Sequence, residues 1–352
     1  MLLNSYNPRQ MQMKAREGDL AETRDDAIFD VKGLVHPPDR IVAFIRYFPQ
    51  KSGRRKRETT AYRKIYPLSL RFKLLKKMFP DYLVHDPVFD EILCEIPVEK
   101  VKRIYDPIKR LKEMRNSKTL DSVEDKALKL ASLLKETAGI QWNSLGVSGS
   151  ILVELHLPAS DIDPVVYGSE NCRKVYSALQ DLLHDQHSHF TSYTVPDLRR
   201  LFAFRSRDTK VSFEDFVRTE PRKFLQGKFL GKDYYIRFVK NWNEIEEKYG
   251  EVRYVNTGRA RINATVTEDS EAIFTPCIYR VNNVQPITGV AAEPIEEIVS
   301  FRGRFCEQAK KGETVIAEGK IERVIDRRRG REHYRLLLGN RPEDFMVLTQ
   351  PS

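Results

Sequence analysis

Two short stretches, Gly146-Val147-Ser148-Gly149-Ser150 and Ser160-Asp161-Ile162-Asp163-Pro164-Val165-Val166-Tyr167, decide how the chain folds. The first puts a Gly-Ser turn at the end of a short apolar strand, and the second puts two carboxylates at the start of another. Because alternate residues of a strand point to the same face, Asp161 and Asp163 are predicted to project together. The pattern predicts a strand, a turn with a short helix and a second strand, followed by a helix over 169–184.

Two carboxylates beside a Gly-Ser turn suit a nucleoside triphosphate (NTP) and a divalent metal ion. Asp161 and Asp163 offer the oxygen ligands that Mg²⁺ or Mn²⁺ prefers, so both are predicted metal ligands and catalytic residues. Gly149 and Ser150 offer backbone N–H groups and a hydroxyl, so both are predicted to hold phosphate oxygens of the NTP. With two metal ions, one would activate the attacking oxygen and the other would neutralise the leaving pyrophosphate.

This combination resembles the nucleotidyltransferase superfamily of DNA polymerase β, whose pattern is a Gly-Ser turn, a short helix and Asp-x-Asp on a strand. The offset of twelve residues from Gly149 to Asp161, and the wording Ser160-Asp161-Ile162-Asp163, match the minimal nucleotidyltransferases. The match covers roughly 145–183. The resemblance implies a polymerase-β-like core that transfers a nucleotidyl group from an NTP to an acceptor hydroxyl.

Two longer phrases, 29–38 and 89–97, are similar to those of an uncharacterised archaeal family of predicted nucleotidyltransferases. That resemblance covers most of the chain and implies no known substrate. The sequence also departs from the superfamily pattern, because the minimal enzymes commonly carry an Arg-Gly pair inside the short helix where this chain has Val153 and Glu154.

Active members of the superfamily also use a third carboxylate on a neighbouring strand, which here corresponds to 233–238. Asp233 is therefore the predicted third catalytic residue, with a turn aspartate as the alternative interpretation. Glu214 and Asp215 are further candidates, although the helix dipole alone explains acids in the first turn of a helix.

Other polar residues have two interpretations each. Arg237 and Lys240 are predicted to contact the triphosphate, and otherwise are solvated strand cations. The histidines His184, His187 and His189 could bind a transition metal, but a polar helix end is the preferred interpretation.

Positive charge is concentrated in one stretch. Between Lys51 and Lys77 there are eleven basic residues and one acid, Glu58, so this stretch carries the whole net charge of +10 and the rest is formally neutral. Tyrosines and a phenylalanine lie among the cations, and a second basic loop spans 327–331. Both predict contacts to an RNA or DNA backbone, tRNA being one possibility, and otherwise are solvated loops. The predicted contacts are Arg54, Arg55, Lys56, Arg57, Arg63, Lys64, Arg327, Arg328, Arg329 and Arg331.

The chain as a whole is predicted to be α+β. We expect a polar segment over 1–24, a basic α+β domain over 25–115, a nucleotidyltransferase-like catalytic domain over 116–250 and a β-rich, barrel-like domain over 251–352. The barrel is suggested to be of the oligonucleotide-binding type by strand spacing alone. Helices are predicted over 68–79, over 98–115 with a kink or break at Pro107, and over 122–137 with Ser122 as N-cap. C-terminal strands are predicted over 259–266, 272–281, 314–325 and 333–338.

Composition excludes several classes of protein. The cysteines Cys94, Cys172, Cys277 and Cys306 lack paired spacing, so buried reduced thiols are predicted. No apolar run approaches the roughly twenty residues that span a bilayer, and the first residues form no hydrophobic h-region. A cytoplasmic protein with no membrane partner is expected. Neither a Walker-type loop nor Gly-x-Gly-x-x-Gly is present, and the oligomeric state is not determined.

A second function from a different class stays open. A nucleic-acid-binding protein could keep the nucleotidyltransferase fold after losing catalysis together with the third carboxylate. A carboxylate that reaches both Asp161 and Asp163 would favour the enzyme, and an Arg or Lys in that place would favour the binding protein. A scaffold is a third possibility, in which the two aspartates would face no cleft.

Overall fold

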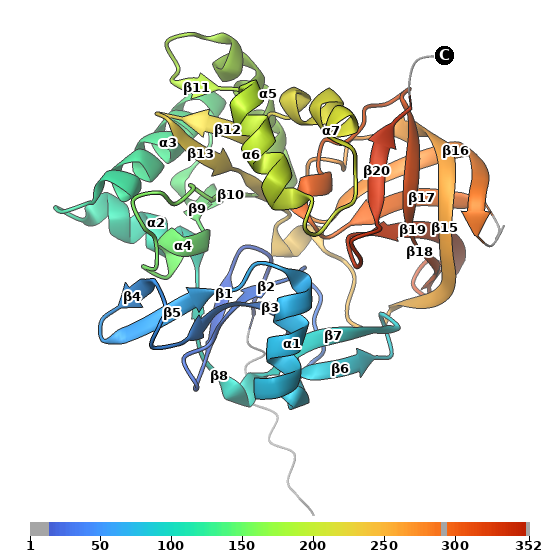
Figure 1. Ribbon diagram of the computed structural model, residues 1–352, viewed down its shortest axis with the longest axis horizontal. Coiled ribbons are helices and arrows are strands. Elements are labelled where there is room, and N and C mark those ends of the chain that lie inside the picture. The colour runs from blue at the N-terminus through green and yellow to red at the C-terminus, as the bar shows by residue number, and fades with distance from the viewer. Residues whose placement is uncertain (1–13, 290–293, 350–352) are drawn as a thin grey trace, which may run out of the picture.

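The computed structural model describes residues 14–289 and 294–349 and has an α+β architecture, as predicted. Figure 1 shows an N-terminal sheet with one long helix at the bottom of the view, a unit of helices and short sheets above it, and a β-barrel on the right. No helix in the described ranges is long and apolar enough to cross a bilayer. All four cysteines are buried and unpaired, as expected.

The N-terminal unit is an antiparallel sheet with strand order β4-β5-β3-β2-β1-β8, in which β7 pairs with both β3 and β6. Helix α1 lies within the predicted range 68–79. The elements are β1 (Leu20–Thr23), β2 (Ile28–Val31), β3 (Arg40–Pro49), β4 (Arg55–Arg57), β5 (Thr60–Lys64), α1 (Leu68–Met78), β6 (Leu83–Asp86), β7 (Glu91–Pro97) and β8 (Val101–Tyr105).

Several strands of this sheet differ from the sequence prediction. Strands β4, β6 and β7 were not predicted, and β4 lies in the expected basic loop. Strand β1 lies in the segment predicted to be polar and aperiodic. All four of its residues are buried between β2 and β8, so its sequence lacks the alternation of polar and apolar residues that would have predicted a strand. Strand β8 lies where a helix was predicted over 98–115. Its residues pair with β1 at the sheet edge, and the helix starts only at Pro107.

The middle unit has a three-stranded mixed sheet of order β14-β10-β9, in which β10 is antiparallel to β9 and parallel to β14. A second small sheet joins β11, β12 and β13. The elements are α2 (Pro107–Asn116), α3 (Ser122–Ala138), β9 (Leu145–Val147), α4 (Gly149–Leu152), β10 (Pro164–Tyr167), α5 (Ser169–His184), β11 (Phe190–Thr191), α6 (Val195–Arg205), α7 (Phe213–Thr219), β12 (Gln226–Phe229), β13 (Lys232–Tyr235) and β14 (Arg237–Val239).

Local signals for these helices were mostly correct. Helix α3 ends at Gly139, whose φ of 62° is the left-handed conformation that glycine favours. Its N-cap is Asp121 and not the predicted Ser122, because the Asp121 carboxylate accepts from the amides of Val123 and Glu124 in a capping box.

The C-terminal unit is a closed barrel, since β15, β16, β17, β19 and β18 pair in a ring and β18 returns to β15. Strands β17 and β19 are parallel, and β20 extends β18. Strands β17 and β20 were not predicted, whereas the oligonucleotide-binding type stays a prediction. The elements are β15 (Val252–Glu268), β16 (Cys277–Gly289), β17 (Ile295–Ser300), β18 (Thr314–Asp326), β19 (Arg331–Leu338) and β20 (Phe345–Leu348), and short 3-10 turns cover Pro80–Tyr82, Val98–Lys100, Trp142–Ser144, Glu220–Arg222, Trp242–Glu244 and Gly303–Phe305.

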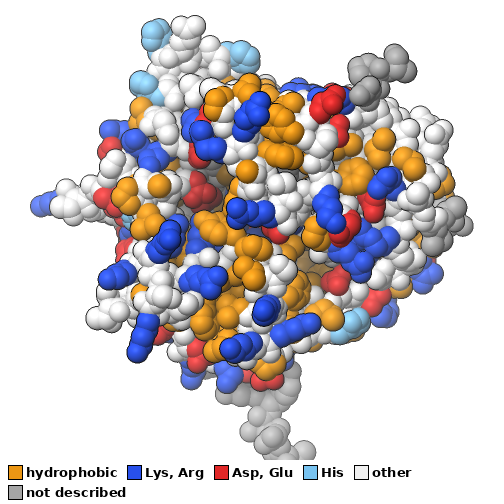
Figure 2. All heavy atoms as spheres, viewed as in Figure 1, with side chains coloured by type: hydrophobic (Ala, Val, Ile, Leu, Met, Phe, Trp, Pro, Cys, Tyr) orange, Lys and Arg blue, Asp and Glu red, His pale blue; other side chains and the backbone are white. Residues whose placement is uncertain are grey.

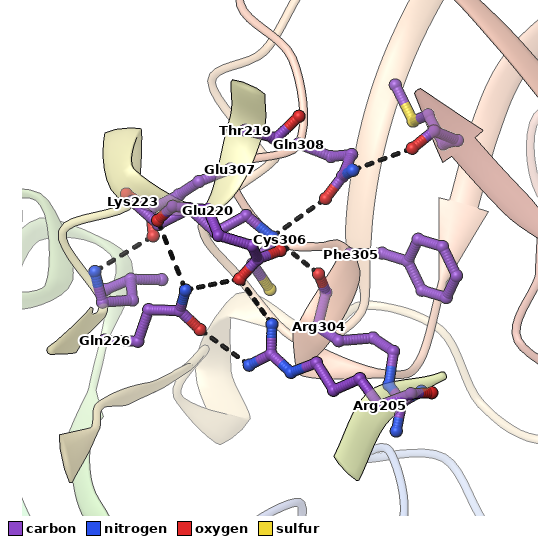
Figure 3. A network of polar contacts seen from close by, with 12 residues as sticks. Arg205, Thr219, Glu220, Lys223, Gln226, Arg304, Phe305, Cys306, Glu307 and Gln308 are labelled. Carbon is purple, nitrogen blue, oxygen red and sulfur yellow. Dashed lines mark hydrogen bonds and ion pairs between the residues drawn. The ribbon is translucent and has the colours of Figure 1, made fainter. Parts of the chain in front are cut away.

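A buried polar network ties the barrel to the middle unit (Figure 3). Glu220 accepts from Lys223 at 2.8 Å and from Arg205 and Gln226 at 2.5 Å. Lys223 also donates to Gln308 of the barrel side at 2.9 Å. Although burial opposes it, the charges of Arg205 and Lys223 lower the pKa of Glu220. Every charge in this network therefore has a partner, as buried charges require.

The N-terminal sheet packs directly on the Gly-Ser helix. Leu152, Val153 and Leu155 form one buried cluster with Tyr47 and Tyr62 of the sheet, joined by Leu20 and Ile28. Val153, which follows α4, is only 1% exposed, so its side chain is used for contact between the two units. The N-terminal sheet consequently covers the turn that precedes the two aspartates.

Candidate active site

The Gly-Ser turn is shaped to receive the carboxylate of Asp163. The backbone N–H of Ser148 donates to the carbonyl of Asp163 at 2.8 Å, which fixes the turn against β10. Gly149 has a φ of 63°, and a Cβ atom there would lie 1.8 Å from the Asp163 Oδ2 atom. Only glycine fits, both for its backbone conformation and because the carboxylate lies against its Cα.

The two predicted metal ligands lie side by side, with buried Ile162 between them. Within the described ranges, neither side chain forms a hydrogen bond or an ion pair. Burial, followed by the charge of Asp161, raises the pKa of Asp163 to about 6, against the opposing charges of Lys64, Arg46 and Arg237. Two unpartnered carboxylates whose charges repel one another fit a divalent cation bound through oxygen ligands.

The hydroxyl of Ser150 supports the same interpretation. Ser150 is 1% exposed, and its Oγ atom has no hydrogen-bond partner among the described residues. The hydroxyl of Tyr47, which is fully buried in the facing N-terminal sheet, is also without a partner. Because buried polar groups are normally hydrogen-bonded, two orphan hydroxyls near unpaired carboxylates indicate room for a polar ligand.

On the neighbouring strand β14, the residue beside Asp163 is Arg237. Strand β14 runs parallel to β10 with Arg237 opposite Val165, on the same face as Asp163. The Arg237 guanidinium pairs with Glu17 at 2.7 Å and with Asp30 at 3.5 Å. Although burial opposes it, these two carboxylates raise the pKa of Arg237.

Asp233, predicted to be the third catalytic residue, lies beside Asp161 but does not join the pair. The backbone N–H of Ile162 donates to the carbonyl of Asp233 at 2.9 Å, while the Asp233 carboxylate is 56% exposed and pairs with Lys228 at 2.8 Å. In the part of the chain described, neither Asp161 nor Asp163 belongs to a group of three acids or histidines whose ligand atoms all lie within 4.8 Å of one another.

The other predicted ligands lie elsewhere or are occupied. Glu214 and Asp215 pair with Arg218 on their own helix, at 2.6 Å and 3.5 Å. Lys240 pairs with Glu271. His184, His187 and His189 form no ligand cluster in the described ranges, which agrees with a polar helix end.

One group of possible ligands does exist outside this site. Asp121, Glu124 and His156 place ligand atoms within 4.8 Å of one another. Asp121 caps α3 and accepts from His156 at 2.6 Å, and Glu124 pairs with Arg110 at 2.5 Å. Helix capping and ion pairing account for all three side chains.

The N-terminal unit presents two unpaired cations to the aspartates. Arg46 of β3 and Lys64 of β5 form no ion pair with any described residue, and the charge of each lowers the pKa of Asp163. Arg71 lies beside them and donates to the carbonyl of Ile65 at 3.3 Å. Burial, followed by the charge of Arg46, lowers the pKa of Arg71 to about 10. Arg46 and Lys64 thus lie near Asp163 without forming an ion pair among the described residues, so they can also bind an anionic ligand.

Sequence reasoning named Lys64 but missed Arg46. The signal was present, because Arg46 is the one charged residue inside the apolar run 41–48. A charge in a buried strand needs a partner or a function. The β-branched and aromatic pattern of 41–48 predicts a strand but assigns no role to the charge of Arg46.

The two predicted nucleic-acid contact regions differ in how their charges are used. Arg54, Lys56 and Arg63 are exposed and form no ion pair with described residues. Arg55 donates to Ser160 at 3.4 Å, and Arg57 pairs with Glu22 at 2.9 Å. Figure 2 shows Lys and Arg side chains spread over the lower part of this face, where β4, β5 and α1 lie.

In the barrel loop, by contrast, acids neutralise most of the cations. Arg328 pairs with Asp326 at 3.2 Å, Arg329 pairs with Glu246 at 3.8 Å, and Arg331 pairs with Glu296. No pair is found for Arg327 among the described residues. Fixed counter-charges leave this loop little net attraction for phosphates.

Over 343 residues the chain is 34% identical to the uncharacterized protein MJ1086 of Methanocaldococcus jannaschii, an alignment that covers 95% of this chain and 98% of that protein. No protein-family model and no solved structure matches the chain.

Proposed function

We propose that this chain, which belongs to the same family as the uncharacterized Methanocaldococcus jannaschii protein MJ1086, is a metal-dependent nucleotidyltransferase acting on a nucleic-acid acceptor. The observation that carries the proposal is the pair Asp161 and Asp163. Asp163 lies against Gly149, and neither carboxylate has a protein partner within the described ranges. A mixed sheet of three strands holds the pair, which supports a polymerase-β-like core.

Asp161 and Asp163 would hold Mg²⁺ or Mn²⁺, which supplies positive charge to the phosphates as pyrophosphate leaves. The Ser150 hydroxyl would donate to a phosphate oxygen, and the Arg46 and Lys64 cations would bind other oxygens of the triphosphate. These contacts would fix the α-phosphorus for in-line attack.

In the proposed reaction, the acceptor hydroxyl oxygen forms a bond to the α-phosphorus, and the bond from that phosphorus to the bridging oxygen of the pyrophosphate breaks. The acceptor proton passes to water, since no third carboxylate reaches the pair in the described part of the chain. This absence of a carboxylate base predicts a slow reaction that accelerates with rising pH.

Arg237 favours a second candidate function. A cation beside Asp163, where active relatives are expected to carry a carboxylate, is what a catalytically degenerate member would have. Such a protein would bind nucleotide or nucleic acid without turnover. The unpaired carboxylates favour the enzyme, because their repulsion is relieved when a metal ion binds between them.

The test is incubation of the full chain with each labelled NTP, Mg²⁺ or Mn²⁺ and total cellular RNA, beside an Asp161→Asn/Asp163→Asn double variant. Label in RNA with the wild type alone supports transfer and names the acceptor. Thermal unfolding of both proteins controls for folding. Absence of label with every NTP, while both proteins bind RNA equally well, would leave the degenerate binding protein as the better account.

A further inference from the structure

An exposed pair of aromatic rings bridges the N-terminal unit and α6. The ring centroids of Tyr66 and Phe204 lie 5.3 Å apart with the ring planes at 89°, and the two residues are 37% and 44% exposed. Figure 1 shows the C-terminal end of α6 directly above the start of α1, where this contact joins the two units. Adjoining exposed apolar side chains can mark a binding site.

The ring pair shares its cations with the two aspartates. The Nζ atom of Lys64 lies 4.7 Å from the centre of the Tyr66 ring, and the Arg46 guanidinium lies 5.3 Å from it. The charges of these same residues lower the pKa of Asp163. Arg46 and Lys64 therefore lie over the Tyr66 ring and also act on the charge of Asp163.

Phe204 has the ring face that a ligand could use. Lys64 and Arg46 lie over the Tyr66 ring, whereas Phe204 touches Tyr66 in a perpendicular arrangement that uses at most one of its faces. In the described ranges no cation and no second ring packs on Phe204. Tyr66 thus holds Phe204 in place, and Phe204 leaves a flat apolar surface open to solvent.

The elements around this pair carry exposed cations. Arg63 of β5 and the α1 residues Lys73, Lys76 and Lys77 are exposed and form no ion pair with a described residue. Proteins that bind single-stranded nucleic acid combine such a basic surface with aromatic side chains on which unpaired bases stack. In a duplex the faces of the bases are already stacked, so this surface suits a single strand.

We infer that Phe204, supported by Tyr66, stacks a base of a single-stranded nucleic acid whose phosphates contact Arg63 and the lysines of α1. The strand would run toward Arg46, Lys64 and the aspartates, so that its end would present the acceptor hydroxyl. That last step rests on the proposed function. Stacking itself does not, because it needs neither metal ion nor NTP.

The test measures strand binding by the full chain in buffer containing EDTA and no NTP. The probes are fluorescent single-stranded oligoadenylate and oligodeoxyadenylate of roughly 12 nucleotides, within the range that one such surface covers. Anisotropy gives Kd for each probe, so the ribose and deoxyribose arms distinguish RNA from DNA. A duplex of the same length is the third probe.

The informative variant is Phe204→Leu, which keeps an apolar contact with Tyr66 and removes the flat ring. We expect it to weaken single-strand binding by roughly 10-fold, with an unchanged slope against salt, because stacking is lost and no charge is removed. Phe213→Leu on α7 is the matched control, since that ring packs against Phe202, and its Kd should stay that of the wild type. Thermal unfolding of each variant verifies folding.

Equal affinity of Phe204→Leu and wild type would overturn the inference, as would duplex binding as tight as single-strand binding or no binding of any strand. Because the assay contains no NTP and no metal ion, it is separate from the test of transfer. Stacking without transfer would retain this inference and overturn the enzyme proposal. Transfer with unchanged strand affinity in Phe204→Leu would overturn this inference alone.

Discussion

Two regions of the molecule bury charge in opposite ways. At the junction with the barrel, Glu220 is bound by Arg205, Lys223 and Gln226, and these partners lower its pKa despite burial (Figure 3). Just before β10, Asp161 and Asp163 lie next to each other and neither has a hydrogen-bond or ion-pair partner in the described ranges. The pKa of Asp163 is raised to about 6. Buried charge with partners stabilises a fold, whereas partly buried charge without partners leaves a place for a ligand.

The largest effect is expected when the two unpaired carboxylates are removed. Asp161→Asn/Asp163→Asn should lower nucleotidyl transfer by on the order of 1,000-fold, because the cation loses both charged ligands. The unfolding free energy should stay the same or rise, since the repulsion between the carboxylates is gone. Label incorporation and urea unfolding measure the two effects. Destabilisation without loss of transfer would show that the pair is structural.

Removing a paired charge should have the reverse result. Glu220→Gln leaves Arg205 and Lys223 buried without their counter-charge, so we expect destabilisation by about 3 kcal/mol. Urea unfolding measures it, with Glu246→Gln as the control, because Glu246 is 78% exposed and its loss should change stability by less than about 0.5 kcal/mol. A change below about 1 kcal/mol in Glu220→Gln would contradict our account of the junction.

A third prediction uses pH. Because the folded-state pKa of Asp163 is raised from 3.8 to about 6, the folded state binds the proton more tightly, and this group's contribution to stability is lost as pH rises from about 4 to about 6. Mg²⁺ at a large excess over its Kd should restore about 2 kcal/mol at pH 7.5 and less at pH 5, where it must displace a proton.

Thermal unfolding with and without Mg²⁺ at the two pH values tests this prediction. Asp163→Asn is the matched control: it should lose the part of the pH dependence that Asp163 contributes, and it should show no Mg²⁺ effect. An equal Mg²⁺ effect in the wild type and in Asp163→Asn would place the cation elsewhere.

The smallest expected effect compares the two basic regions. Substituting Arg54, Lys56 and Arg63 together by alanine should weaken single-strand binding by about 10-fold and reduce the salt slope by about 2. The equivalent triple variant of Arg328, Arg329 and Arg331 should change affinity by less than about 2-fold, since acids already neutralise that loop. Salt titrations of Kd measure both, and equal losses in the two variants would refute the distinction.

Local patterns predicted much of the fold around the site. The Gly-Ser turn, the strand after Asp163, the helix over 169–184, its neighbour ending at Gly139 and a C-terminal barrel all follow from spacing and turn residues. Strands β1 and β8 were missed because each is defined by its pairing within a larger sheet and not by its own periodicity.

The sequence by itself placed Asp161 and Asp163 on one face of a strand and Gly149 beside them, because residue spacing within a strand and a turn is a local property. Only the tertiary structure decided which charges are paired. In the folded chain Arg237 pairs with Glu17 and Asp30, and Asp233 pairs with Lys228. Arg46 and Lys64 lie near Asp163 and form no ion pair in the described ranges. Charge pairing depends on distances between residues far apart in the chain, and those distances are set by how the units pack.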